Sequence, residues 1–92
     1  MKITVHFGAQ LANAAGLDEE SVEVEDGVTY RAFLRILCDR YGERFEAFVH
    51  DEKGELHLSL LAAINDRQVE KGKDVALADG DTMTLLSPMA GG

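Results

Sequence analysis

Cysteine, proline and tryptophan are almost missing from this chain of 92 residues, which has one cysteine, one proline and no tryptophan. A single cysteine excludes an internal disulfide and any metal or iron–sulfur site built from several cysteines of one chain. The chain also lacks an apolar run long enough to span a membrane, and Met1 and Lys2 lead directly into a strand-like segment rather than a signal peptide. We therefore expect a cytoplasmic protein.

Positive charge is scarce as well. The chain has 9 lysines and arginines against 17 acidic residues, which gives a formal net charge of −8. Such a surface repels phosphate backbones and anionic lipid headgroups, so we expect neither nucleic acid nor a membrane as a partner. It favours association with a basic patch on another protein. Hydrophobic residues make up 46% of the chain and charged residues 28%, as in an ordinary folded domain, and the length allows only one.

The first 24 residues have the pattern of two strands. Polar and apolar residues alternate over residues 2–7, which predicts a strand whose inward-facing residues are Ile3, Val5 and Phe7. Val22 and Val24 mark a second short strand. Residues 8–16 contain two glycines and several small residues, and we expect them to form a loop that joins the strands into a hairpin.

A helix is predicted over residues 30–41. Thr29 is a good N-cap, and Gly42 is placed to end the helix in the left-handed conformation. Apolar residues recur at steps of three and four and form one stripe, which consists of Phe33, Leu34, Ile36, Leu37 and Tyr41. We expect this apolar stripe to pack against a sheet. Residues 43–49 could add one short helical turn.

The second half of the chain has the pattern of further strands. Residues 56–64 carry apolar side chains in both phases, which predicts a strand covered at least in part on both faces. Asn65 and Asp66 favour a turn before a short returning strand at 68–69. Residues 78–81 form another predicted turn, and residues 82–86 form the last strand.

This order of elements predicts an α+β fold of the β-grasp type, with a mixed sheet of four to five strands and the main helix on one face. The final strand can lie parallel to the first. We expect residues 1–87 to form the domain and residues 88–92 to form a flexible Gly-Gly tail.

The last strand also predicts a surface. Met83 and Leu85 share the phase that faces the helix, so Leu86 is expected on the opposite face of the sheet together with Leu61 and Ala63. An apolar patch there is typical of a docking surface, and a half-covered central strand is the alternative.

The end of the chain has a specific pattern. A Gly-Asp turn at 80–81 leads into the last strand, then Pro88, Met89 and Ala90, and finally Gly91 and Gly92. This segment resembles the C-terminal signature of the MoaD/ThiS family of ubiquitin-like sulfur carriers, and residues 63–69 are similar to that family's strand, Asn-containing turn and short strand. Two features depart from the molybdopterin synthase small subunits. Many of those carry two prolines where this chain has a serine and a proline, and the acidic stretch 51–55 resembles longer carriers.

The resemblance implies a function that lies in the tail. The Gly92 carboxylate would be adenylated by an E1-like enzyme that uses ATP, converted to a thiocarboxylate, and would donate sulfur, most simply to a molybdopterin synthase large subunit. Gly91 and Gly92 would pass close to the partner's backbone, where a side chain would clash. Leu61, Ala63, Leu86, Pro88, Met89 and Ala90 are the expected partner-binding residues. The chain itself is expected to bind no cofactor and to be a carrier rather than an enzyme.

Two alternatives to the molybdopterin pathway stay open. The chain could serve as a protein modifier that is conjugated through Gly92 to lysines of target proteins, or as a sulfur carrier for cysteine or thiamine synthesis. The modifier and the carrier begin with the same adenylation, so the sequence does not separate them. A plain β-grasp interaction domain with an accidental Gly-Gly end is a third hypothesis.

Other residues that often carry chemistry are interpreted as structural. Cys38 lies near the apolar stripe of the helix, where a free cysteine behaves as a small hydrophobe. His6, His50 and His57 lack metal-ligand spacing on a predicted helix, and we expect solvated surface histidines and no metal site. The acidic residues at 18–20 and 51–52 are expected to be solubilising charges in turns.

Overall fold

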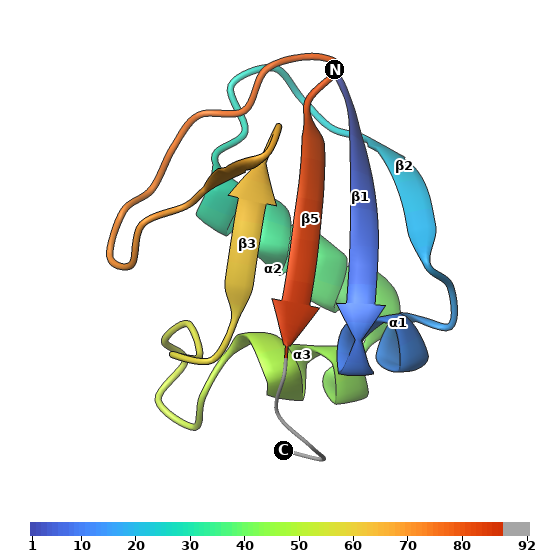
Figure 1. Ribbon diagram of the computed structural model, residues 1–92, viewed down its shortest axis with the longest axis vertical. Helices are drawn as coiled ribbons and strands as arrows, with labels where there is room; N and C mark the ends of the chain where they lie inside the picture. The colour runs from blue at the N-terminus through green and yellow to red at the C-terminus, as the bar shows by residue number, and fades with distance from the viewer. Residues whose placement is uncertain (88–92) are drawn as a thin grey trace.

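The computed structural model describes residues 1–87, and its sheet has five strands in the order β2-β1-β5-β3-β4 (Figure 1). β1 pairs antiparallel with β2 and parallel with β5, while β3 pairs antiparallel with both β5 and β4. α2 crosses one face of this mixed sheet. The predicted β-grasp fold is therefore confirmed. The elements are β1 (Lys2–Ala9), α1 (Gln10–Ala15), β2 (Glu19–Glu23), α2 (Tyr30–Tyr41), α3 (Glu43–Val49), β3 (Leu61–Ile64), β4 (Arg67–Gln68) and β5 (Thr82–Ser87).

The β1–β2 hairpin forms as predicted, but its connection is not a simple loop. Residues 10–15 form the helix α1, which ends at Gly16 in the left-handed conformation with φ of 82°. Three alanines favour a helix there, and Leu11 is fully buried in the core. A helix this short is marginal on its own, so the burial of one leucine, which the local pattern does not reveal, decides its conformation.

The main helix matches its prediction at both ends. The Thr29 side chain accepts a hydrogen bond from the backbone N–H of Ala32 at 3.3 Å, which is the N-cap geometry. Gly42 ends the helix with φ of 94° and ψ of −172°, so it has positive φ but not the left-handed helical conformation that was expected. The chain turns there directly into α3, which covers the predicted residues 43–49 as a seven-residue helix.

The predicted strand over residues 56–64 is wrong in its first half, because only residues 61–64 form β3. Leu56 makes an isolated bridge with His50, and the Leu60 N–H donates to the His57 carbonyl in a turn. Leu58 is 84% exposed. An apolar pattern produces a strand only where a neighbouring strand offers hydrogen-bond partners, and β5 begins to do so opposite Leu61.

Turn residues fix the start of β5 beside β3. Asn65 and Asp66 both adopt positive φ, 49° and 68°, and form the predicted tight turn into β4. The Asn65 side chain then accepts a hydrogen bond from the Thr82 N–H at 2.9 Å and donates to Asp81 at 2.7 Å. The returning strand is found one residue earlier than predicted, at 67–68.

The core lies between α2, α3 and the inner face of the sheet. Its fully buried large side chains come from the two central strands and from the helices, and they are Ile3, Val5, Leu11, Phe33, Leu34, Leu37, Phe45, Val49, Met83 and Leu85. The inward phase predicted for β1 and β5 is thus confirmed. Within residues 1–87, no helix has the length and apolar character needed to span a membrane.

Candidate functional site

The last strand, β5, is central in the sheet, and its successive side chains alternate between the buried face and the outer face. It lies between β1 and β3, and the chain continues from its end toward the tail (Figure 1). Met83 and Leu85 are fully buried beneath the helices, whereas Leu86 is 36% exposed on the other face. The predicted phase of Leu86 is therefore confirmed. Its part in binding a partner stays a prediction.

An apolar pair occupies the outer face of the sheet at the end of β5. Leu86 lies directly opposite Leu61 in the antiparallel β3–β5 ladder, and Leu61 is 38% exposed. Ala63, two residues further along β3, lies on the same face and is half-buried. The three residues expected on this face from their phase are thus brought together, and we call them the outer apolar patch.

Gly8 supports this patch. The prediction that it belongs to the loop 8–16 is wrong, because β1 extends through Ala9. Gly8 is the register partner of Leu86 on β1. A Cβ at Gly8 would lie only 3.0 Å from the Leu86 Cδ1 atom, so the missing side chain makes room for the leucine. A glycine within a strand pattern is the signal that could have revealed it, because such a glycine marks a close approach of neighbouring atoms.

The tail residues assigned to the chemistry lie outside the described residues. These residues are Pro88, Met89, Ala90, Gly91 and Gly92, and their expected roles stay predictions. The structure shows where the domain ends, at Ser87. Ser87, the last residue of β5, is paired with Ala9 at the end of β1.

The prediction that residues 18–20 lie in a turn is wrong for Glu19 and Glu20, which belong to β2, and Glu20 makes a structural contact. Glu20 lies in β2 and accepts hydrogen bonds from the Arg40 guanidinium at 2.9 and 3.0 Å and from the Tyr41 hydroxyl. These contacts hold the pKa of the Glu20 carboxyl below its usual range, with Arg40 the largest cause. Burial, followed by the contact with Glu20, raises the pKa of Tyr41 to about 12. Glu20 therefore joins the edge of the sheet to the end of α2.

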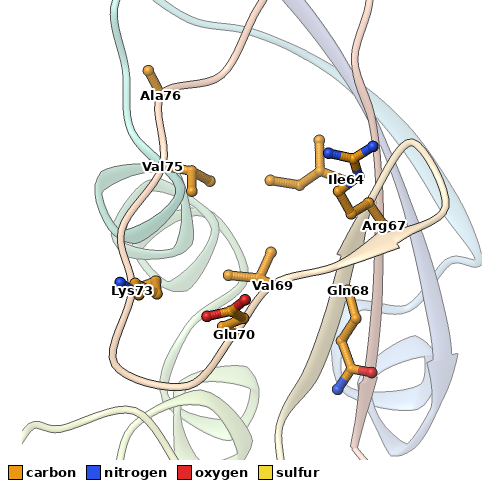
Figure 2. Close-up of a pocket in the computed structure, with 8 residues that line it drawn as sticks. All are labelled: Ile64, Arg67, Gln68, Val69, Glu70, Lys73, Val75 and Ala76. Atoms are coloured by element: carbon orange, nitrogen blue, oxygen red, sulfur yellow. The ribbon is translucent and has the colours of Figure 1, made fainter.

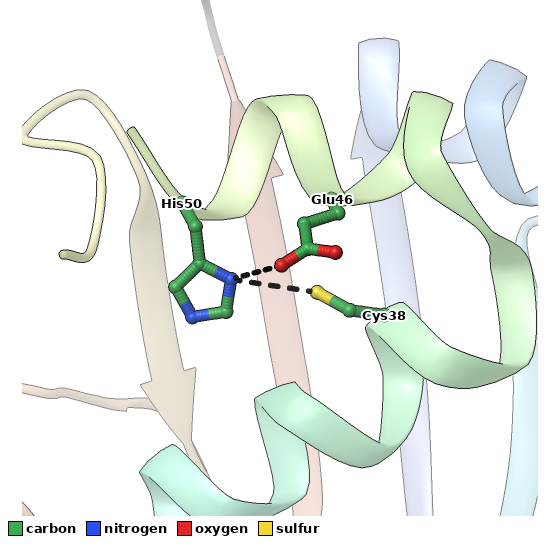
Figure 3. A group of neighbouring side chains, drawn as sticks. All are labelled: Cys38, Glu46 and His50. Carbon is green, nitrogen blue, oxygen red and sulfur yellow. Dashed lines mark hydrogen bonds and ion pairs between the residues drawn. The ribbon is translucent and has the colours of Figure 1, made fainter. Parts of the chain in front are cut away.

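A second cluster lies between α2 and α3, where Cys38, Glu46 and His50 converge (Figure 3). The His50 Nδ1 atom lies 3.8 Å from the Cys38 sulfur and 3.3 Å from a Glu46 oxygen. Cys38 is buried as predicted, and this burial is the largest cause that raises its thiol pKa to about 12. The thiol is therefore protonated and a poor nucleophile near neutral pH.

The prediction that all three histidines are solvated is wrong for His50, whose side chain is only 14% exposed. Its position depends on α3, which the sequence analysis treated as one optional turn. His50 is the C-cap residue of α3, and its backbone N–H donates to the Glu46 carbonyl at 2.8 Å, so the two side chains lie close together although they are four residues apart. That spacing was the available signal.

An apolar hollow lies elsewhere, beside β4, and has a volume of about 480 Å³. Figure 2 shows the side chains of Ile64, Val69 and Val75 directed into the space between the β4 segment and the loop at 73–76. Its lining includes no cysteine, histidine or hydroxyl group. It offers apolar contact and no nucleophile, so we assign no chemistry to it.

The fold and the outer apolar patch at the end of the last strand define the class of ubiquitin-like β-grasp proteins. Comparison with protein families then gives the particular family, because the model of the ThiS family matches residues 5–92. The chain belongs to the ThiS family, whose members are small sulfur carriers and not enzymes. A search of curated proteins finds no match.

Solved structures similar to this chain include three kinds of relative. Small archaeal modifier protein 1 of Haloferax volcanii is 27% identical over 100% of both chains, with a TM-score of 0.85. A Pyrococcus furiosus protein described as a molybdopterin converting factor, subunit 1, is 28% identical over 97% of this chain and 99% of its own, with a TM-score of 0.74. A chain of the Amycolatopsis orientalis BexX/CysO complex is 28% identical over 98% and 99%, with a TM-score of 0.69.

Proposed function

We propose that this chain carries sulfur as a thiocarboxylate on the C-terminal carboxylate of Gly92. The observation that carries the proposal is the match of the ThiS family model, which extends through residue 92 and so includes the Gly-Gly end. A carboxylate is a poor electrophile. An E1-like partner would therefore join it to AMP from ATP, with release of pyrophosphate, and a sulfur nucleophile would then replace AMP at the carbonyl carbon.

The outer apolar patch is the proposed docking surface for these enzymes. Leu61 and Leu86 are adjacent in the ladder and keep more than a third of their surface exposed. β5 leads from this patch toward the tail, so an enzyme that binds the patch would hold the domain near the point where the reactive end begins. The net charge of −8 favours an enzyme with a basic surface.

Molybdopterin synthesis is the proposed pathway, in which the carrier would donate its sulfur to a pterin precursor held by a synthase large subunit. The similarity to the Pyrococcus furiosus protein supports it. Conjugation to target lysines is the second candidate, and the similarity to small archaeal modifier protein 1, with a TM-score of 0.85, favours it. The similarity to a chain of the BexX/CysO complex supports a carrier that binds a partner protein.

The first experiment tests the carrier chemistry. Incubation with a cognate E1-like enzyme, ATP and a sulfur source should raise the intact mass by the difference between a sulfur and an oxygen atom. Deletion of Gly92, or addition of one residue after it, should abolish this change and leave the melting temperature as it was. If the extended protein still donates sulfur without being trimmed back to Gly92, the terminal carboxylate is not the reactive group.

The second experiment separates the pathways. The thiocarboxylate form is offered a molybdopterin synthase large subunit with its pterin precursor, a cysteine synthase or a thiazole synthase, and the fate of the sulfur is followed. In parallel, the adenylated form is offered lysine-containing proteins from the same cell. Sulfur transfer only to the pterin supports the proposed pathway. An isopeptide bond without sulfur transfer supports the modifier instead.

A further inference from the structure

Three metal-binding atoms that are far apart in the sequence meet between α2 and α3. Cys38 comes from the last turn of α2, Glu46 lies in α3, and His50 follows α3 directly as its C-cap residue. The Cys38 sulfur, a Glu46 carboxylate oxygen and a ring nitrogen of His50 all lie within 4.8 Å of one another, and Figure 3 shows them directed at a common space. Cys38 is 2% exposed, so this space is reached from the side of the other two residues.

The spacing fits the ligands of a tetrahedral ion. With metal–ligand distances of about 2.3 Å to sulfur and about 2.1 Å to nitrogen and oxygen, tetrahedral geometry places sulfur and nitrogen about 3.6 Å apart and nitrogen and oxygen about 3.4 Å apart. The observed separations are 3.8 Å between the Cys38 sulfur and His50 Nδ1 and 3.3 Å between His50 Nδ1 and Glu46 Oε2. These two separations match a tetrahedral ligand set, and the third, between the Cys38 sulfur and a Glu46 oxygen, is at most 4.8 Å.

A nucleophilic triad does not explain the cluster. In such a triad the acid holds one ring nitrogen of histidine and the nucleophile contacts the other. Here the Cys38 sulfur and the Glu46 oxygen both approach the same atom, His50 Nδ1. That nitrogen carries either one lone pair or one proton, so it cannot serve both neighbours well. An ion placed between the three atoms would use every one of them.

We infer that Cys38, Glu46 and His50 form a site for a divalent transition metal of the zinc class, with a fourth position left for water. Sulfur, imidazole and carboxylate together suit zinc and cobalt better than magnesium or calcium, which prefer oxygen ligands alone. The Cys38 thiol gives up its proton to solvent as the sulfur–metal bond forms. Because the ligands come from both helices, the ion joins α2 to α3.

Neighbouring charges are compatible with such an ion. Thiolate and carboxylate balance its two positive charges. Arg35 donates to Glu46 Oε2 at 2.7 Å, and this contact orients the Glu46 carboxylate. Arg35 also pairs with Asp39 at 3.4 Å, so these two neighbouring residues together carry no net charge. His50 also lines a hollow of about 740 Å³.

The test is a cobalt titration of the reduced protein, followed by zinc competition. We expect one equivalent of Co²⁺ to produce a thiolate-to-cobalt charge-transfer band, one equivalent of Zn²⁺ to remove it, and native mass spectrometry to show one bound zinc. Cys38→Ala should abolish the band, and Glu46→Gln and His50→Gln should weaken binding at least about tenfold. His57→Gln is the matched control, because His57 lines the same hollow without belonging to the cluster, and it should bind as the parent does.

Two outcomes would overturn the inference. One is the absence of a charge-transfer band in the parent protein at one equivalent of cobalt. The other is zinc binding of equal strength in Cys38→Ala, which would mean that surface carboxylates hold the ion. Glu46→Gln keeps the test decisive if Cys38→Ala fails to fold, because the Glu46 side chain is 35% exposed and its replacement is isosteric.

Discussion

Leu85 and Leu86 are neighbours on β5 and face opposite sides of the sheet. Replacing each of them by aspartate therefore separates an effect on stability from an effect on docking. Leu85 is fully buried under the helices, whereas Leu86 is 36% exposed on the outer apolar patch. We predict that Leu86→Asp remains folded and loses partner binding, and that Leu85→Asp does not fold.

The magnitude for Leu86 follows from its burial. Complete burial of a leucine contributes about 1.5–3 kcal/mol, so the roughly two thirds of Leu86 that is covered contributes about 1–2 kcal/mol. Aspartate in a strand costs up to about 1 kcal/mol more. A domain of this length has a free energy of unfolding of about 5–14 kcal/mol. A loss of about 2 kcal/mol lowers the melting temperature by about 8–16 °C and leaves the protein folded at room temperature.

Leu85 gives the opposite result because its whole side chain is in the core. Removing a buried leucine side chain costs about 2–5 kcal/mol, and an unpaired buried charge costs several kcal/mol more. The sum reaches the stability of the whole domain. We therefore expect Leu85→Asp to show no cooperative melting transition.

The assay combines a circular dichroism melt with binding and adenylation by the cognate E1-like enzyme. Leu58→Asp is the control, since Leu58 is 84% exposed and lies outside the patch, and it should change neither measurement. Loss of cooperative melting in Leu86→Asp would show that Leu86 belongs to the core. Unchanged binding and adenylation by a folded Leu86→Asp protein would show that the patch is not the docking surface.

Three further predictions concern stability alone. Ala9→Gly should raise the free energy of unfolding by about 1 kcal/mol in urea denaturation, because Ala9 has φ of 53° and ψ of −126°, a conformation that favours glycine. Thr29→Ala should lower the free energy of unfolding by about 1 kcal/mol, because the N-cap hydrogen bond from Ala32 is lost. Thr29→Ser should keep most of this stabilisation. Stability should also fall as the pH rises from about 9 to about 12. The pKa values of Cys38 and Tyr41 are raised in the folded protein from 9.0 and 10.0 to about 12, so the unfolded chain releases these protons first.

Each of these predictions has a result that contradicts it. A lower urea midpoint in Ala9→Gly would mean that the junction between β1 and α1 is not strained. Equal stability of the Thr29→Ala and Thr29→Ser proteins would show that the N-cap hydrogen bond does not stabilise the fold. A free energy of unfolding that stays constant between pH 9 and pH 11 would show that neither the Cys38 thiol nor the Tyr41 hydroxyl is held in its neutral form.

The sequence by itself determined the features that depend on residues close together in the chain. The alternation of β1 and β5 set which side chains are buried, because successive residues of a strand point to opposite faces. Thr29 and Gly42 set the bounds of α2 through capping and positive φ, and Asn65 with Asp66 set the turn after β3. The phase of Leu86 and the resemblance of the Gly-Gly end needed no tertiary information either.

The tertiary structure alone decided what depends on a partner segment. α1 is a helix because Leu11 packs into the core. Within residues 1–87, no strand pairs with residues 56–60, and these residues do not form one. Cys38 and His50 meet because the chain reverses at Gly42, and no local pattern encodes the distance between two helices. Local propensity acts within a few residues, whereas these features arise from contacts between segments that only the packed fold brings together.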